Sequence, residues 1–291
     1  MELVVNGIIT GILTGGVYAL MASGLTLIFG VMDIINVGQG ALVILGAYLS
    51  YLLEVKFQVD LFLGLLITMP IMFLFGLFLE WAFIRPLKRD RTILSILVTF
   101  AIALVIEGFL GLAFSTSIVK LRSDYVDTSF QIGNFYLAHI YVYGFVLSLV
   151  LLAGLYVILY RTKFGYSLRA SMQNRTAAQL VGIDVERVSA ITFGIAVALA
   201  AAGGMVYGAT SAFNPNSHYD LISRLLVIII LGGMGSLRGA LIASLGMLVI
   251  EDVTAVVWSP VWANTVFFAL LVLVMVIRPR GLFGQLESRK Q

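Results

Sequence analysis

Residues 161–187 read RTKFGYSLRASMQNRTAAQLVGIDVER, a polar stretch between two long apolar runs. The stretch contains five basic residues, which are Arg161, Lys163, Arg169, Arg175 and Arg187. Because an Arg or Lys at the centre of a bilayer costs about 2.5 to 3.5 kcal/mol on insertion scales, these residues keep the stretch out of lipid. The stretch therefore lies in water and separates two membrane-inserted parts of the chain.

Residues 164–181 of this stretch have a helical pattern with one apolar face. The apolar face consists of Leu168, Met172 and Leu180. Gly182 suits the C-terminal cap of this helix, and Asp184 suits the N-cap of the next helix. The pattern predicts a short amphipathic helix that is either a protein-docking element or a solvated loop whose basic residues only orient the chain.

The composition identifies the class of protein. Of the 291 residues, 60% are hydrophobic and 11% are charged, and the mean hydropathy is +1.05. Soluble globular domains usually contain about 25% charged residues. We therefore predict an all-α integral membrane protein in which residues 1–291 form a single transmembrane domain. Residues 1–16 have no basic region or clear cleavage site, so we interpret them as the start of the first helix and not as a removable signal.

Few residues are available for metal or redox chemistry. The chain has no cysteine, which excludes disulfides and thiolate metal sites. His139 and His218 have no acidic cluster at ligand spacing, and we interpret them as structural or solvated histidines. We expect no metal and no cofactor. The net charge of +3 is modest, and we attribute it to cytoplasmic loops and not to nucleic-acid binding.

Eight apolar segments are long enough to cross a bilayer, which takes about 20 residues. They are residues 7–30, 34–53, 61–83, 92–114, 140–160, 189–213, 225–257 and 262–278. Three connectors hold 13 of the 18 Lys and Arg residues, and these connectors are 84–91, 161–187 and 278–291. By the positive-inside rule they are cytoplasmic. The connectors then predicted to lie outside are 54–60, 115–139 and 214–223.

Two of the apolar segments are interrupted by glycines and polar side chains. Residues 30–49 read GVMDIINVGQGALVILGAYL, and residues 231–246 read LGGMGSLRGALIASLG. Each interior Gly costs a helix about 1 kcal/mol relative to Ala. The topology also requires residues 225–257 to cross the membrane an even number of times or not at all, so we predict a break in this segment.

Glycine-interrupted segments in both halves of a chain are typical of discontinuous or re-entrant helices that line a translocation path. The alternative is close helix packing through small residues, which we expect at Gly203, Gly204 and residues 198–202. We favour the path for the two interrupted segments because glycine alone does not explain their polar side chains. The candidate path residues are Asp33, Asn36, Gln39, Gly232, Gly233, Gly235 and Arg238.

Four stretches resemble the permease subunit of branched-chain amino acid ABC importers of the Leu/Ile/Val type. They are GLTLIFGVMDIINVGQGALVILGAYL at 24–49, RPL at 85–87, GYSLRASMQNRTAAQLVGIDVERV at 165–188 and LGGMGSLRGALIASLG at 231–246. The resemblance covers essentially the whole chain and implies an ABC importer permease fold. Family members typically read I-N-x-A-H-G-E in the second segment, whereas this chain has Gln39 and Ala41 in place of the His and Glu. This departure leaves the exact solute open.

The resemblance also implies partners. The segment 161–187 would dock on an ATPase subunit, and the residues at matching positions are Gly165, Arg169, Ala170, Asn174, Ala177, Gly182, Ile183 and Asp184. The expected partners are two ATP-binding cassette subunits, a second homologous permease subunit, an extracytoplasmic solute-binding protein and membrane lipid, without nucleic acid. The expected location is the cytoplasmic (inner) membrane of a bacterium or archaeon.

The sequence shows no catalytic constellation. It lacks a G-x-x-x-x-G-K-[ST] phosphate loop, so an ATP site of that kind must belong to a separate subunit, and we expect a transport subunit and not an enzyme. The expected solute is a branched-chain amino acid or a related small polar molecule. The alternatives are a permease for urea or short amides and a stand-alone ion-coupled carrier. Such a carrier needs ionisable groups along its path. The available groups, Asp33, Glu107 and Arg238, are scattered in the sequence, which disfavours a carrier. Glu251 and Asp252 end the seventh segment, and we predict that they are solvated.

Overall fold

The computed structural model describes residues 2–87, 91–123, 125–126, 128–132, 135–279 and 281–283. Five basic residues that support the predicted orientation lie outside the described residues, and they are Lys88, Arg89, Arg280, Arg289 and Lys290. Within the described part, eight helices are long and apolar enough to cross a membrane. The prediction of an all-α membrane protein with about eight apolar segments is confirmed.

The eight long helices are α1 (Glu2–Met32), α2 (Gln39–Phe57), α3 (Leu61–Leu79, continued by η1, Glu80–Ile84), α4 (Arg91–Phe114), α5 (His139–Arg161), α8 (Val185–Thr210), α10 (Leu237–Val257) and α11 (Pro260–Ile277). The shorter elements are α6 (Lys163–Gln173), α7 (Arg175–Leu180), η2 (Pro215–Ser217), α9 (His218–Gly232) and the antiparallel pair β1 (Ser129–Ile132) and β2 (Phe135–Ala138).

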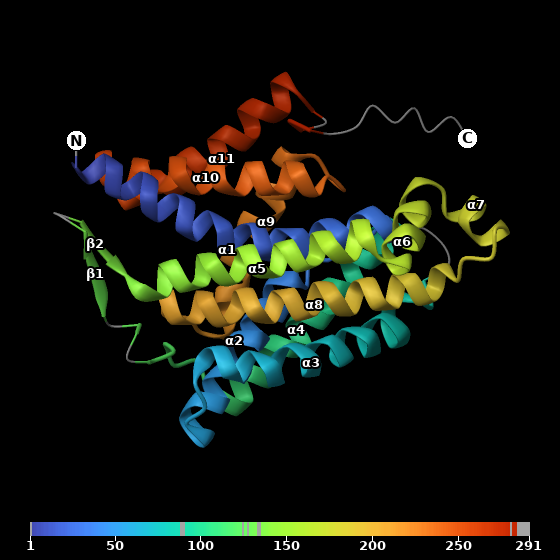
Figure 1. Ribbon diagram of the computed structural model, residues 1–291, viewed down its shortest axis with the longest axis horizontal. Coiled ribbons are helices and arrows are strands. Elements are labelled where there is room, and N and C mark those ends of the chain that lie inside the picture. The colour runs from blue at the N-terminus through green and yellow to red at the C-terminus, as the bar shows by residue number, and fades with distance from the viewer. Residues whose placement is uncertain are drawn as a thin grey trace.

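The long helices α1, α3, α5 and α8 run along the long axis of the molecule (Figure 1). The hairpin β1–β2 and the start of α1 lie at one end, which we call the hairpin end. The helices α6 and α7 lie at the opposite end, which we call the basic end. The positive-inside rule predicts that the basic end faces the cytoplasm.

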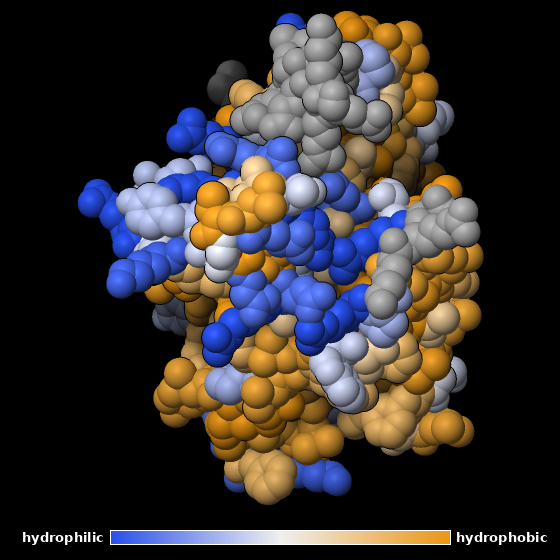
Figure 2. Space-filling view, turned by 90° about the vertical axis from the view of Figure 1, so that its right-hand side faces the viewer, coloured by the Kyte–Doolittle hydropathy of each residue, from blue (hydrophilic) through white to orange (hydrophobic). Residues whose placement is uncertain are grey.

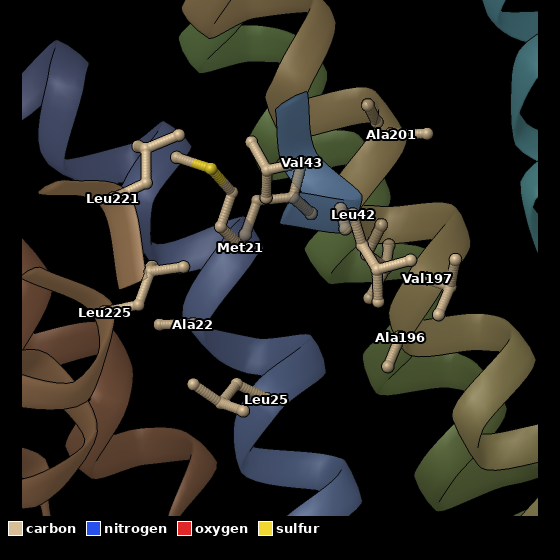
Figure 3. Close-up of a cluster of buried hydrophobic side chains, with 14 of the residues drawn as sticks. Met21, Ala22, Leu25, Leu42, Val43, Ala196, Val197, Ala201, Leu221 and Leu225 are labelled. Carbon is tan, nitrogen blue, oxygen red and sulfur yellow. The ribbon is translucent and has the colours of Figure 1, made fainter. Parts of the chain in front are cut away.

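The core lies where α1, α2, α8 and α9 meet. Figure 3 shows Met21 and Leu25 of α1 close to Leu221 and Leu225 of α9, and all four side chains are fully buried. The peripheral helices instead keep large apolar side chains exposed, and Leu112 of α4 is 90% exposed. Since water-soluble surfaces avoid large contiguous apolar patches, these helices are the ones that contact lipid.

Small residues allow the core helices to approach closely. A Cβ atom at Gly204 of α8 would overlap the carbonyl oxygen of Val43 of α2. Residues 198–202 on the same helix are also buried. These contacts confirm the prediction that the small residues of this helix serve packing, which in lipid depends on close van der Waals contact.

Both predicted interruptions are real breaks in the helices. α1 ends at Met32 and α2 begins at Gln39, while α9 and α10 are separated by residues 233–236. Gly233 and Gly235 have φ angles of 91° and 83°, a region that other residues rarely adopt. The 15 residues of α9 extend about 22 Å, which is short of a hydrocarbon core of about 30 Å.

The single helix predicted for residues 164–181 is wrong, because the segment forms two helices that are broken at Asn174. Asn174 has extended backbone angles, and its side chain accepts a hydrogen bond from the N–H of Ala177 at 2.9 Å. Asn competes with the helix in this way and favours a cap. The predicted caps are confirmed, since Gly182 has a φ of 88° and Asp184 Oδ1 accepts a bond from the N–H of Arg187 at 3.0 Å.

Candidate functional site

A cavity of about 630 Å³ opens at the basic end, and we call it the inner cavity. It lies between the end of α1, the helix α6 and the turn between α9 and α10. Its lining includes Phe29, Asp33, Arg169, Met172, Gly235 and Arg238. The cavity thus brings together candidate path residues and one candidate coupling residue, Arg169, which the sequence placed in separate sets.

Three elements touch at the wall of this cavity. A Cβ atom at Gly30 of α1 would meet the end of the Met172 side chain of α6, and it would lie 3.7 Å from the Cα of Gly235. Tight packing of this kind transmits displacement, because protein interiors have few voids into which a side chain can yield. The end of α1 at Gly30 therefore lies between α6 and the α9–α10 turn.

Aromatic side chains hold Arg169 at the edge of the inner cavity. Its guanidinium lies 4.7 Å from the ring centroid of Tyr160 and 4.9 Å from that of Tyr166. Contacts of this kind contribute about 0.5 to 1 kcal/mol at exposed sites. Arg169 is therefore positioned by the ends of α5 and α6 and carries a positive charge into the cavity.

The other coupling candidates divide between turns and surface. Gly165 is buried in the sharp turn from α5 to α6, where a Cβ atom would overlap the carbonyl oxygens of Ile158 and Leu159. Ala170 and Ile183 are half-buried. The exposed candidates are Asn174, Ala177, Gly182 and Asp184. The structure thus exposes most of α7 and the turn that follows it at the basic end.

The most exposed apolar side chains of this segment lie at the end of α7. Leu180 is 84% exposed and Val181 is 77% exposed, whereas Leu168 is buried, so the prediction that Leu168 and Leu180 share one face is wrong. The reason is the break at Asn174, which turns α7 away from the face that α6 buries. Figure 2 shows the basic end as a hydrophilic surface with an apolar patch inside it. We call Leu180 and Val181 the apolar tip.

Asn36 and Gln39 lie in the core and outside the inner cavity. Asn36 Nδ2 donates to Gln39 Oε1 at 3.1 Å, and Gln39 Nε2 donates to the carbonyl oxygen of Ala196 at 3.4 Å. Both side chains are almost completely buried. This geometry matches the packing alternative, in which the amides connect helices and do not meet a solute.

Gly232 and Gly233 also contribute to structure. Gly232 touches Gly239 so closely that a Cβ atom on either residue would overlap the backbone of the other. Gly233 caps α9 with its positive φ angle. These two glycines join α9 to α10 as a tight hairpin whose turn faces the inner cavity.

A charged cluster that the sequence analysis missed lies toward the hairpin end. Arg224 of α9 donates from Nε to Asp220 Oδ2 at 3.0 Å and from Nη2 to Asn264 Oδ1 at 2.8 Å, and its Nη1 pairs with Glu251. Glu251 is 8% exposed, so the prediction that it is solvated is wrong. The i,i+4 spacing of Asp220 and Arg224 was the available sequence signal.

Glu107 also has partners that its isolated position in the sequence does not suggest. Its Oε2 lies 2.9 Å from His218 Nε2 and accepts a hydrogen bond from the Tyr219 hydroxyl at 3.0 Å. His218 is buried, which agrees with a structural histidine. This contact joins α4 to the start of α9.

A second cavity of about 220 Å³ borders the charged cluster at Arg224 and Glu251, and we call it the outer cavity. Its lining includes Thr14, Tyr18, Met21, Arg224, Glu251 and Asp252. Figure 3 shows Leu25 of α1 and Leu225 of α9 beside Met21, and all three side chains are fully buried. On α1, Leu25 lies between Met21, which lines the outer cavity, and Phe29, which lines the inner cavity, and we call Met21, Leu25 and Leu225 the apolar barrier. Both cavities therefore border α1 and the α9–α10 hairpin, and an apolar barrier separates them.

This arrangement defines a class of protein: a multi-pass helical membrane protein with two polar cavities along one helix seam and a pair of short, exposed helices at one end. Residues 7–275 match the family described as branched-chain amino acid transport system / permease component. The chain belongs to this family. It is therefore a transport permease component and not itself an enzyme.

Similar proteins cover nearly the full length of the chain. The high-affinity branched-chain amino acid transport system permease protein LivH of Salmonella typhimurium is 25% identical over 96% of this chain and 95% of its own. The probable branched-chain amino acid transport permease protein LivH of Methanocaldococcus jannaschii is 27% identical over 94% and 90%. Among solved structures, PsaBC from Streptococcus pneumoniae in complex with Fab gives a TM-score of 0.49 at 11% identity, covering 97% of this chain and 94% of that one.

Proposed function

We propose that this chain is the permease subunit of an ABC importer for branched-chain amino acids or a related small polar solute in a bacterial or archaeal cytoplasmic membrane. Residues 1–291 act as one transmembrane domain, with residues 161–187 as the coupling segment. Family membership and the names of the similar proteins support the solute class. The apolar tip carries the proposal of a cytoplasmic partner, because two adjacent exposed apolar side chains on a hydrophilic surface mark a protein contact.

The solute route runs along α1 and the α9–α10 hairpin. Successive parts of α1 support this route, since Thr14 and Tyr18 border the outer cavity, Leu25 lies in the apolar barrier, and Phe29 and Asp33 border the inner cavity. A closed barrier between two polar cavities is what a resting importer requires, because an open path would let solutes leak.

Coupling follows from the position of α6. Its Met172 touches the wall formed by α1 and the α9–α10 turn, and α7 at its C-terminal end carries the apolar tip. An ATPase subunit that binds the apolar tip and moves during its cycle displaces α6. This displacement shifts Gly30 against Gly235 and opens the barrier.

The hairpin end is the place for an extracytoplasmic solute-binding protein. An aromatic group of Phe62, Tyr125 and Tyr143 packs there with neighbouring ring centroids 5.6 to 6.2 Å apart. The Tyr125 hydroxyl donates to Asp60 Oδ2 at 2.7 Å, and burial raises the pKa of Tyr125 to about 12. Tyr125 thus remains a neutral donor at physiological pH and holds this end in one shape for a partner. A second permease subunit completes the assembly.

The experiment is reconstitution of the assembled importer in proteoliposomes, with leucine uptake and ATP hydrolysis measured together. The double substitution Leu180→Ser with Val181→Ser should lower both rates about tenfold, which corresponds to a loss of about 1.4 kcal/mol of docking energy. Ile118→Ser is the matched control, since Ile118 is exposed in the connector at the hairpin end. Normal uptake and hydrolysis by the tip variant would refute docking at this surface.

An ion-coupled carrier is the second candidate function, and one observation favours it. The buried pair Arg224–Glu251 is the kind of intramembrane ionisable group that coupled carriers use. The two candidates separate in liposomes that contain the chain without ATPases. Uptake driven by a sodium or proton gradient would support the carrier, whereas the importer requires ATP. Inhibition of leucine uptake by urea or short amides would support the alternative solute.

A further inference from the structure

We propose that the outer cavity binds the primary ammonium group of the solute through the carboxylates of Glu251 and Asp252. The assignment of this ligand as the transported solute rests on the proposed function. The presence of a cation-binding site in the cavity rests on the contacts of the cavity itself.

The carboxylate of Glu251 is only half satisfied. One oxygen pairs with Arg224, whereas Oε2 is buried without a hydrogen-bond partner. Asp252 Oδ2 on the neighbouring residue is also buried without a partner. A buried polar atom without a partner costs about 1 to 3 kcal/mol, and more when it is charged. Two such oxygens in one cavity wall point to a donor that binds there.

The charges of the cluster select a cation. Arg224 is the positive group at the cavity, and its donors are already engaged by Asp220, Glu251 and Asn264. Two carboxylates of the cavity lining, those of Glu251 and Asp252, therefore accompany one guanidinium. The excess of negative charge favours a cationic ligand, because an opposite charge close by stabilises a buried ion.

The remaining lining suits a small molecule with a polar backbone. Hydroxyl groups of Tyr18 and Tyr207 line the cavity, and each can donate a hydrogen bond to a carboxylate. The hydroxyls of Thr14 and Thr210 also line it but donate to the carbonyl oxygens of Thr10 and Val206. The cavity volume of about 220 Å³ lies below the roughly 300 to 1,000 Å³ typical of pockets for drug-sized ligands. Met21 and Leu248 add apolar surface. An amino acid presents the ammonium, carboxylate and apolar groups that this lining can contact.

The test measures binding to the full chain, assembled with its subunits in lipid nanodiscs, by equilibrium dialysis of radiolabelled probes. The probes are 3-methylbutylamine, which has only the ammonium group, and 3-methylbutanoate, which has only the carboxylate. Asp252→Asn is the first variant, because Asp252 makes no hydrogen bond to Arg224 in the described structure. Glu251→Gln is the second variant, and Glu107→Gln, whose carboxylate contacts His218 outside this cavity, is the matched control.

The expected result is saturable binding of the amine that weakens at least about tenfold in Asp252→Asn, or about 1.4 kcal/mol, and stays normal in Glu107→Gln. 3-Methylbutanoate should not bind. The inference is overturned if amine affinity is the same in wild type, Asp252→Asn and Glu251→Gln. Saturable binding of radioactive sodium ion without amine binding would also overturn it.

The same experiment keeps the two proposals separate. ATP-driven leucine uptake by the wild-type importer without amine binding would reject the ammonium site and leave the proposed function intact. Amine binding that depends on Asp252, combined with absence of ATP-driven uptake, would reject the proposed function and leave the site.

Discussion

The two interrupted helices look alike in sequence and differ in structure. The first break, between α1 and α2, is followed by GALV at 40–43, and the second, between α9 and α10, is followed by GALI at 239–242. At the first break the polar side chains of Asn36 and Gln39 bond to each other and to the core. At the second break Gly235 and Arg238 face the inner cavity.

This comparison shows that a glycine-rich break with polar residues is not by itself evidence of a solute path. The role of a break depends on the residues and the open space around it. Asn36 and Gln39 are buried, and their amides bond to each other and to the carbonyl oxygen of Ala196 on α8. At residues 233–236 the turn projects to the basic end, where α6 leaves an open cavity. We therefore propose that Asn36 and Gln39 of the first break serve packing, whereas Asp33 of that break and the turn between α9 and α10 border the solute route.

The largest expected effect is at the hairpin between α9 and α10. Gly239→Ala places a Cβ atom on the backbone of Gly232, and overpacking of this kind costs about 3 kcal/mol. Gly246→Ala on the same helix meets nothing within 4 Å and should stabilise the helix by up to about 1 kcal/mol. The unfolding temperature of the purified protein, measured for both variants, should move in opposite directions. Equal shifts would show that the hairpin does not need its close contact.

A smaller effect is expected at the first break. Asn36→Leu or Gln39→Leu leaves the other amide buried without its partner, which costs about 1 to 3 kcal/mol. The double variant should be less destabilised than the sum of the single variants, because no unpaired Asn–Gln amide remains. The measurements are the amount of assembled complex and the rate of uptake per assembled complex. Normal assembly with slow uptake per complex would return Asn36 and Gln39 to the path.

The smallest effect on stability is expected at the second break. Arg238→Gln changes an exposed side chain at the inner cavity and should alter the free energy of unfolding by no more than about 0.5 kcal/mol. Uptake per assembled complex should nevertheless fall several-fold, because the charge at the cytoplasmic mouth is lost. Arg161→Gln, an exposed basic residue of the same end outside the cavity lining, is the control. Equal uptake by both variants would remove Arg238 from the route.

The sequence predicted the architecture well because membrane insertion depends on local properties. Composition along the chain gives the length of each span, the lack of charge within it and the concentration of basic residues in connectors. The residue types at the helix ends predict the caps at Gly182 and Asp184. The breaks in the two apolar segments followed from the cost of glycine in a helix. In residues 161–187 the break at Asn174 was missed because the prediction followed the helical spacing of the apolar residues and gave less weight to the tendency of Asn to cap a helix.

The sequence could not predict the contacts between distant residues. We assigned Asn36 and Gln39 to a solute path because the sequence shows that these side chains are polar but does not show which groups they bond to. Arg224 and Glu251 are 27 residues apart on different helices, so their pairing depends on how α9 folds back on α10. The meeting of Met172 with Gly30 and Gly235 likewise required three elements to be placed in space.

The central claim is that solute passes between the two cavities through the barrier of Met21 and Leu25. The chain has no cysteine, so single substitutions Met21→Cys and Leu25→Cys introduce unique thiols. Met72→Cys is the matched control, since Met72 is equally buried but lies on α3, which packs against α8 and α2. The measurement is the labelling rate with a small water-soluble thiol reagent, in the reconstituted importer at rest and during ATP-driven uptake. Uptake should accelerate labelling at both barrier positions and leave Met72→Cys unreactive. Equally slow labelling of all three cysteines during uptake would contradict passage of the solute through the barrier.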